Sequence, residues 1–143
     1  MEAALGMSFA GKRSLVCMKH VGMNVAADCF INSAITGVKG GLIVIAADDP
    51  SMHSSQNEQD SVIMPSGEGA DAGASDSAEA LEFAKLAYEI SERFDTPVLL
   101  KMCTRVSHSQ SIVDTGERVL PQLKPYEKNQ AKTSCCRRCA PEA

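Results

Sequence analysis

The chain has 143 residues, a mass of 15.2 kDa and a formal charge of −4 at pH 7. This length suits one domain with a single hydrophobic core. The mild acidity argues against a nucleic-acid-binding surface, which is normally basic. No apolar run approaches the roughly 18 residues of a membrane span, and residues 1–11 contain an acid and no basic segment, so no secretory signal is visible. We therefore expect a cytoplasmic α/β protein that binds neither membrane nor nucleic acid.

The hydrophobic pattern predicts that helices and strands alternate along the chain. The expected elements are a helix over residues 2–10, a strand over 14–18, a helix over 24–35, a strand over 42–47, a helix over 77–93 and a strand over 97–103. Residues 42–47 are apolar throughout, which is typical of a strand covered on both faces of a parallel sheet. Asp76 and Glu79 form a capping box before the long helix. This order predicts an α/β fold: an open, mostly parallel sheet with helices on both faces.

In open parallel sheets, ligands bind beyond the carboxyl ends of the strands. The loops that meet this condition are residues 19–23, 48–60 and 104–111. Each contains one histidine, and these are His20, His53 and His108. Each can be a solvated loop residue or part of a site. Because the pKa of histidine lies near neutral pH, His20 and His53 are candidate proton donors.

The loop over residues 48–60 ends in eight consecutive side chains that can form hydrogen bonds. They are His53, Ser54, Ser55, Gln56, Asn57, Glu58, Gln59 and Asp60. Such a run beyond a strand suits a polar ligand or a subunit contact. The chain contains no glycine-rich phosphate-binding motif, so we expect no direct phosphate cradle.

Five segments of the chain resemble the α subunit of indolepyruvate:ferredoxin oxidoreductases. These segments are residues 19–28, 48–60, 92–98, 104–109 and 123–128. The second of them reads DDPSMHSSQNEQD and matches the DDPGMHSSQNEQD of the family almost letter for letter. The similarity covers most of residues 2–132.

The resemblance implies an enzyme that oxidatively decarboxylates aryl pyruvates, such as indolepyruvate, to aryl-acetyl-coenzyme A. It implies thiamine diphosphate with magnesium and 4Fe-4S clusters as cofactors, and coenzyme A as co-substrate. The implied partners are a β subunit, ferredoxin and a small 2-oxoacid. Another 2-oxoacid:ferredoxin oxidoreductase, with a different acyl substrate, remains the alternative within the same class.

The resemblance also implies that the chain holds only part of such an enzyme. Residues 1–113 correspond to part of the pyrimidine-binding domain, an incomplete thiamine-diphosphate-binding fold, and residues 114–143 to a linker toward a following domain. The activating glutamate of the family belongs to a segment upstream of Met1, so we assign no catalytic residue and expect no activity from the chain alone. The candidates for cofactor or interface contacts are Lys19, His20, Gly22 and Asn24, together with residues 53–60.

Two segments depart from the family pattern. Residues 61–74 and the residues after Lys132 become family-like again when short shifts of the reading frame are assumed. This hypothesis predicts a flexible loop over 61–74 in place of a strand, and places 133–143 out of frame. A lineage-specific loop and tail are the alternative. A sheet that lacks its first strands would also have an open edge.

The six cysteines indicate no metal site. Cys17, Cys29 and Cys103 lie in apolar stretches, where free cysteine behaves as a small hydrophobic residue. The tail contains Cys135, Cys136 and Cys139, but no second ligand pair follows them. Two other hypotheses are a noncatalytic module that docks on a full-length subunit and a small metal-binding protein that uses the tail cysteines.

Overall fold

The computed structural model of the chain describes residues 1–61, 70–118, 120 and 125. In this part of the chain four strands form one sheet in the order β1-β2-β4-β3, and every neighbouring pair is parallel. Across the sheet they are β1 (Ser14–Lys19), β2 (Leu42–Asp48), β4 (Val98–Cys103) and β3 (Ala70–Gly73). The predicted α/β fold is confirmed, and the sheet is parallel throughout.

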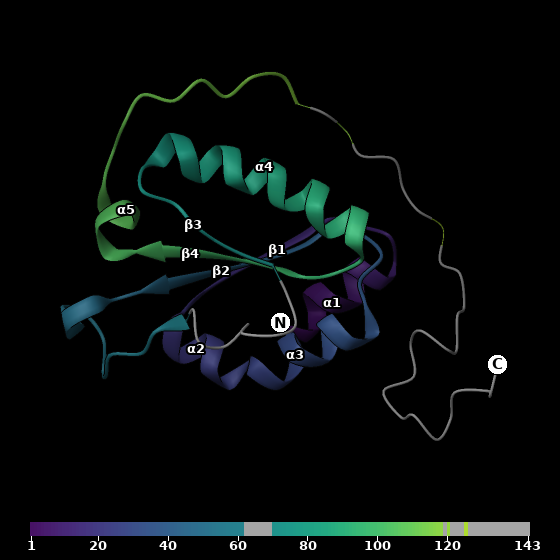
Figure 1. Cartoon of the computed structure of the whole chain (residues 1–143), viewed down its shortest axis with the longest axis horizontal. Coiled ribbons are helices and arrows are strands. Elements are labelled where there is room, and N and C mark those ends of the chain that lie inside the picture. The colour runs from purple at the N-terminus through teal and green to yellow at the C-terminus, as the bar shows by residue number, and fades with distance from the viewer. Residues whose placement is uncertain (62–69, 119, 121–124, 126–143) are drawn as a thin grey trace.

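Helices cover both faces of the sheet, as predicted (Figure 1). One face carries α1 (Glu2–Phe9), α2 (His20–Val25) and α3 (Ala27–Thr36), and the other carries α4 (Ser77–Phe94). A 3₁₀ turn, η1 (Pro50–Met52), follows β2, and a short helix, α5 (Thr104–His108), follows β4. Because all strands are parallel, the loops that leave their carboxyl ends gather at one edge of the sheet.

The sheet separates two layers of hydrophobic core. Val44 and Ala46 of β2 face α2 and α3 and belong to the same buried cluster as Phe30. Ile43 faces α4 and packs in a cluster with Ala87. Successive residues of a strand point to opposite faces, so a strand covered on both sides needs a continuous apolar run. This confirms the interpretation of residues 42–47.

The long helix α4 begins with the predicted capping box. The Asp76 carboxylate accepts a hydrogen bond from the Glu79 backbone N–H at 2.8 Å. The Glu79 carboxylate reaches one residue further back than in the usual box and accepts from the Ser75 backbone N–H at 2.7 Å. The helix ends at Asp95, which has a φ of 53° and therefore takes the left-handed conformation that terminates many helices.

Two helices replace the single helix predicted over residues 24–35, so that prediction is wrong in its boundaries. The first, α2, begins at His20, inside the segment predicted as a loop, and Ala26 separates it from α3. No side chain caps α2, and Gly22 lies within it, so the local helical signal is weak. His20 and Met23 are fully buried on this helix, and their packing stabilises it where local propensity does not.

The loop predicted over residues 104–111 is wrong in its first half, where α5 forms. Val106 is buried on this helix, and the Ser107 hydroxyl donates a hydrogen bond to the Cys103 carbonyl at 3.0 Å. Packing of one apolar side chain and this local bond stabilise a turn that is too short to give a periodic sequence signal.

The strand β3 lies within residues 61–74, so the prediction of a loop without a strand is wrong for residues 70–73. Its backbone pairs in parallel with β4, from Ala70 opposite Val98 to Gly73 opposite Lys101. Pairing uses backbone N–H and C=O groups, which every residue except proline supplies, so small residues can complete the edge of a sheet. Residues 62–69 and 133–143, with the tail cysteines, lie outside the described residues, and the frame-shift hypothesis stays a prediction.

At the opposite side of the sheet, β1 has one neighbouring strand among the described residues, in agreement with the predicted open edge. Leu15 is 44% exposed, and Cys17 is exposed as well. Cys17 lies in an apolar stretch of the sequence, but its side chain is exposed because an edge strand is covered from fewer sides. Cys29 and Cys103 are partly buried.

Candidate functional site

The connection that leaves the carboxyl end of β2 has to cross β4 before it reaches β3, because β4 lies between these two strands in the sheet. Residues 49–61, which we call the edge loop, form the described part of this connection. Side chains from three elements hold it: Lys19 at the end of β1, His20 at the start of α2 and Lys101 in β4. The polar segment is therefore tethered to the sheet and is not a free linker.

Asp49 organises the start of the edge loop. This residue is buried, and one carboxylate oxygen accepts a hydrogen bond from the Ser54 backbone N–H at 2.6 Å. The other accepts from the Thr104 hydroxyl at 2.9 Å. Lys19 Nζ lies 3.9 Å from the carboxylate and donates to the Ser54 carbonyl. These groups, and the Ser54 N–H above all, lower the pKa of Asp49 to about 2, so the carboxylate is ionised at neutral pH.

Lys101 holds the other end of the edge loop. Its Nζ lies 2.6 Å from Asp60 Oδ1 and 3.2 Å from Asp48 Oδ2, so two carboxylates share one ammonium group. Asp48 is buried and also accepts hydrogen bonds from the hydroxyl and the backbone N–H of Ser61. Burial works against the charged form of Lys101, but the hydrogen bonds to Asp60 and Asp48 outweigh it and raise the pKa of the ammonium group.

His20 contacts the middle of the edge loop. Its Nε2 lies 2.9 Å from the Asn57 backbone carbonyl. A carbonyl can only accept, so Nε2 carries the proton, and in the neutral ring Nδ1 is an acceptor. His20 is 1% exposed, and Nδ1 has no hydrogen-bond partner among the described residues. Such buried unpartnered acceptors are uncommon, which marks this nitrogen as a group that a further donor would satisfy.

Two consecutive residues of the edge loop have left-handed backbone conformations. Ser51 has a φ of 66° and Met52 a φ of 54°. This region is unfavourable for residues other than glycine, and it persists where surrounding contacts impose it. Here the Met52 N–H donates to the Asp49 carbonyl at 3.1 Å, and the Asp49 side chain binds Ser54 just beyond. Asp49 therefore holds both sides of a strained turn.

The structure brings some of the predicted site residues together and leaves others apart. The candidates that take part in the tethering contacts are Lys19, His20, Ser54, Asn57 and Asp60. The candidates whose side chains are exposed elsewhere are Asn24, His53, Gln56 and Glu58. Ser55 and Gln59 are half-buried, and Gly22 lies inside α2 against Met18. The binding roles of all of them stay predictions.

The three histidines do not share one site. His20 is buried, whereas His53 and His108 are exposed on the edge loop and at the end of α5. Their position in three loops at the carboxyl ends of the strands therefore does not by itself indicate a shared site.

Sequence reasoning missed Lys101 and Thr104, and did not single out Asp48 and Asp49 within the loop. Lys101 is the only charged residue of the strand predicted over residues 97–103, and a lone charge near the end of a buried strand was the available signal. Its pairing with Asp48 depends on β2 and β4 being neighbours, which the sequence does not reveal.

Asp49 should make the stability of the chain dependent on pH. Its pKa of about 2 lies below the ordinary 3.8, so the ionised carboxylate stabilises the folded state above about pH 4, and this contribution is lost as the pH falls toward 2. We expect Asp49→Asn to lower the urea-unfolding midpoint near neutral pH and to lose that difference under acidic conditions. Unfolding curves from neutral pH to about pH 2 measure this.

Thr104→Val serves as a graded comparison, because it removes only one of the donors to Asp49. Thr104→Val should reduce the pH dependence of the unfolding midpoint under acidic conditions, but by less than Asp49→Asn does. If the unfolding midpoints of Asp49→Asn and of the unaltered chain differed by the same amount at every pH, the stabilising role of the ionised Asp49 carboxylate would be contradicted.

Within the described ranges, no helix combines the length and the apolar character needed to cross a membrane. A parallel sheet with helices on both faces and a tethered polar loop at the carboxyl ends of its strands defines an open α/β domain. No protein-family model matches the chain.

Curated relatives place the chain within a family. It is 46% identical over 126 residues to the indolepyruvate oxidoreductase subunit IorA of Archaeoglobus fulgidus, which covers 81% of this chain and 19% of the relative. The IorA subunit of Methanothermobacter marburgensis is 44% identical over 88% of this chain and 21% of its own length, and that of Pyrococcus horikoshii 48% identical over 85% and 18%. The chain belongs to the IorA family and spans about one fifth of the length of these relatives.

Proposed function

We propose that this chain is part of the α subunit of an indolepyruvate:ferredoxin oxidoreductase, and that residues 1–113 form part of its pyrimidine-binding domain. The observation that carries the proposal is an identity of 44–48% to IorA subunits over 81–88% of the chain. The reaction proposed for the complete enzyme is oxidative decarboxylation of an aryl pyruvate. Ferredoxin is the proposed electron acceptor and coenzyme A the proposed acyl acceptor, and 4Fe-4S clusters of the complete enzyme would supply the electron-transfer chemistry.

Thiamine diphosphate would supply the carbanion chemistry of this reaction. The residues at the carboxyl ends of the strands match the hydrogen-bonding chemistry of its aminopyrimidine half. His20 Nδ1 is a buried acceptor without a partner among the described residues, and the amino group of an aminopyrimidine is a donor. These residues do not fit the magnesium diphosphate half, because no three His, Cys, Asp or Glu side chains of the described residues are grouped as metal ligands. The proposal therefore assigns that half to another part of the enzyme.

The role proposed for the residues of this chain is positioning. Lys19 and Lys101 hold the two ends of the edge loop, and His20 holds its middle. His53 and Glu58 of the loop are exposed and can contact the β subunit or a neighbouring domain. A loop fixed at three points presents such side chains in one arrangement, which binding and catalysis both require.

A chimeric enzyme tests the proposal. Residues 1–118 of this chain would replace the matched region of the Archaeoglobus fulgidus IorA subunit, and the chimera would be combined with the remaining subunits of that enzyme. We expect indolepyruvate- and coenzyme A-dependent reduction of ferredoxin. In the chimera, Lys19→Met should lower kcat/KM roughly tenfold or more by releasing the edge loop.

Lys12→Met is the matched control, because Lys12 is an exposed lysine that precedes the amino end of β1, whereas Lys19 lies at its carboxyl end. It should leave kcat/KM unchanged. A chimera that assembles but reduces ferredoxin only with another 2-oxoacid would identify the alternative substrate. One that assembles and is inactive with every 2-oxoacid would contradict the proposal and favour a noncatalytic module.

A further inference from the structure

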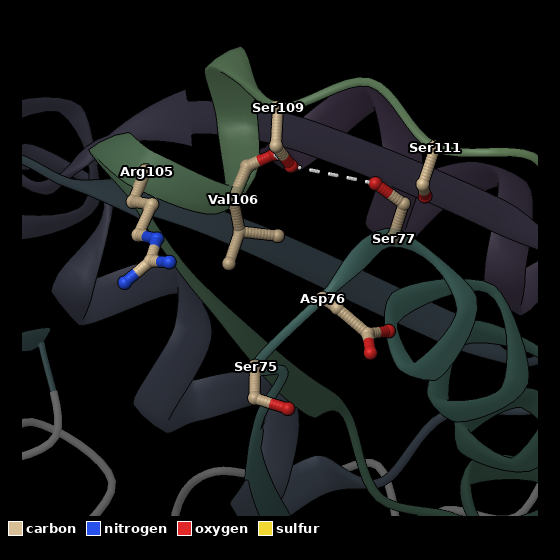
Figure 2. A pocket seen from close by; sticks show the side chains of 7 residues that line it. All are labelled: Ser75, Asp76, Ser77, Arg105, Val106, Ser109 and Ser111. Carbon is tan, nitrogen blue, oxygen red and sulfur yellow. Dashed lines mark hydrogen bonds between the residues drawn. The ribbon is translucent and has the colours of Figure 1, made fainter.

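A pocket of about 180 Å³ lies between the start of α4 and helix α5 (Figure 2). Ser75 and Asp76 line it from the connection between β3 and α4, and Ser77 lines it from the first residue of α4. Arg105, Val106 and Ser109 line it from α5 and its end. These segments follow the carboxyl ends of β3 and β4, so the pocket lies at the edge where parallel sheets bind ligands. It shares no residue with the contacts that tether the edge loop.

Arg105 is the cation of this pocket. Its guanidinium forms no hydrogen bond or ion pair with another residue in the part of the chain that the structure describes. Arg13, in contrast, binds both oxygens of Glu92, at 2.6 and 2.9 Å. Arg105 therefore keeps its full set of N–H donors for a ligand. The Ser109 hydroxyl donates to the Val106 carbonyl at 3.0 Å and lies 3.5 Å from the Ser77 hydroxyl. Ser77 is therefore the hydroxyl that can turn to donate to a ligand.

The acidic groups near the pocket are already engaged with the start of α4. Asp76 accepts from the Glu79 backbone N–H at 2.8 Å, and Figure 2 shows its carboxylate turned away from Arg105. Glu79 accepts from both the hydroxyl and the backbone N–H of Ser75, which lowers the pKa of Glu79. The helix start is thus capped by the chain itself, and the pocket relies on Arg105 and the Ser77 hydroxyl for binding.

These charges also limit the charge of a ligand. Arg105 supplies one positive charge and the Asp76 carboxylate lines the same pocket, so a monoanion would be repelled less than a dianion such as a phosphate monoester. A carboxylate has two coplanar oxygens that match the guanidinium fork. At roughly 30 Å³ for a water-sized group, the pocket has room for on the order of six non-hydrogen atoms.

We propose that this pocket binds a small carboxylate, with Arg105 bound to its two oxygens, the Ser77 hydroxyl as a further donor, and Val106 against a short apolar substituent. The proposal does not depend on the proposed function, since it concerns a pocket that the edge loop does not line.

The test is a titration of the ¹⁵N-labelled full chain with sodium acetate and sodium pyruvate at constant ionic strength, followed by NMR. We expect saturable shifts of the Arg105 side-chain N–H and of the Ser77 and Ser109 amides. Arg105→Gln should raise the Kd roughly tenfold or more, because it removes a charged hydrogen-bond donor. Arg105→Lys keeps the charge but lacks the forked pair of donors. Its Kd should therefore lie between those of the unaltered chain and of Arg105→Gln.

Arg93→Gln is the control, since Arg93 is an exposed arginine over the Phe94 ring at the far end of α4, and it should leave the Kd unchanged. Sodium chloride and sodium phosphate are the comparison salts. Shifts that rise equally with chloride, or that persist in Arg105→Gln, would overturn the proposal. Tighter binding of phosphate than of either carboxylate would overturn it as well. Well-dispersed spectra of each variant show that loss of binding is not loss of folding.

Discussion

Replacing Gly40 with alanine should destabilise the chain by about 3 kcal/mol. A Cβ on residue 40 would lie 2.2 Å from the carbonyl oxygen and 2.5 Å from the carbonyl carbon of Lys12. Both are backbone atoms, so no side-chain rotation relieves the clash. The Gly40 N–H also donates to the Ser8 carbonyl at 2.8 Å, and the buried Ser8 hydroxyl donates to the Gly40 carbonyl. Separating these segments would break bonds that hold α1 to the sheet. Urea unfolding measures the change.

Gly6→Ala provides the matched control. Gly6 lies within α1, and a Cβ there would meet no atom within 4 Å. The same substitution should stabilise the chain by about 0.5–1 kcal/mol, because alanine favours helix over glycine. Equal stabilities of the Gly40→Ala and Gly6→Ala variants would show that the close approach to Lys12 is not a constraint.

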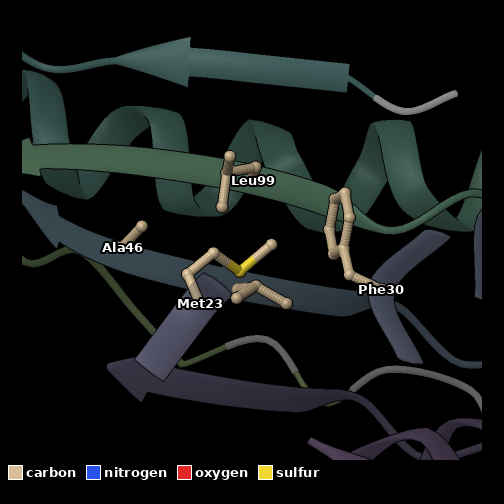
Figure 3. Packing of buried hydrophobic residues seen from close by; sticks show 5 residues of the cluster. Met23, Phe30, Ala46 and Leu99 are labelled. Atoms are coloured by element: carbon tan, nitrogen blue, oxygen red, sulfur yellow. The ribbon is translucent and has the colours of Figure 1, made fainter. Parts of the chain in front are cut away.

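Replacing Phe30 with alanine should cost about 3–5 kcal/mol of unfolding free energy. Phe30 of α3 is 1% exposed and lies in the cluster that joins Met23 of α2 to Val44 of β2 and Leu99 of β4 (Figure 3). Removing the ring loses buried apolar area and leaves a cavity at the point where α3 meets the sheet. Urea unfolding of the purified variant measures the loss.

Phe94→Ala tests the same change where the ring is 64% exposed, at the last residue of α4. Its cost should be within about 0.5 kcal/mol. If Phe30→Ala were as mild as Phe94→Ala, the packing of α3 on the sheet described for this chain would be wrong.

The Phe30 cluster also supports the candidate site. Met23 belongs to the same cluster and lies on α2, which starts at His20. His20 in turn binds the Asn57 carbonyl of the edge loop. Weakening the packing of α3 should therefore loosen the edge loop before the chain unfolds as a whole, since elements with fewer buried contacts open first.

The elements that the sequence predicts well are those with strong local patterns. The 42–47 strand is a continuous apolar run, and the 77–93 helix combines a capping box with apolar residues at helical spacing. The structure confirms both as β2 and α4. The elements that it predicts poorly are α2, β3 and α5, which are short and depend on burial or on pairing with a neighbour.

Part of the candidate site could likewise be predicted from the sequence, and part could not. The polar segment over residues 53–60 was visible as a run of hydrogen-bonding side chains at the end of a strand. The groups that hold it in place were not, because the ion pairs of Lys101 with Asp48 and Asp60 join residues 53 and 41 positions apart. The Arg105 pocket was hidden for the same reason, since its two sides come from the ends of β3 and β4.

By itself, therefore, the sequence determined the α/β class, the parallel sheet, the polar loop at its carboxyl edge and the family, because periodicity, capping and a long distinctive motif are local properties of the chain. Only the tertiary structure decided which strands are neighbours, that His20 is buried with an unpartnered nitrogen, and that Lys101 and Asp49 hold the edge loop. The physical reason is that burial and ion pairing depend on distances in space, which arise only when strands far apart in the chain pair side by side.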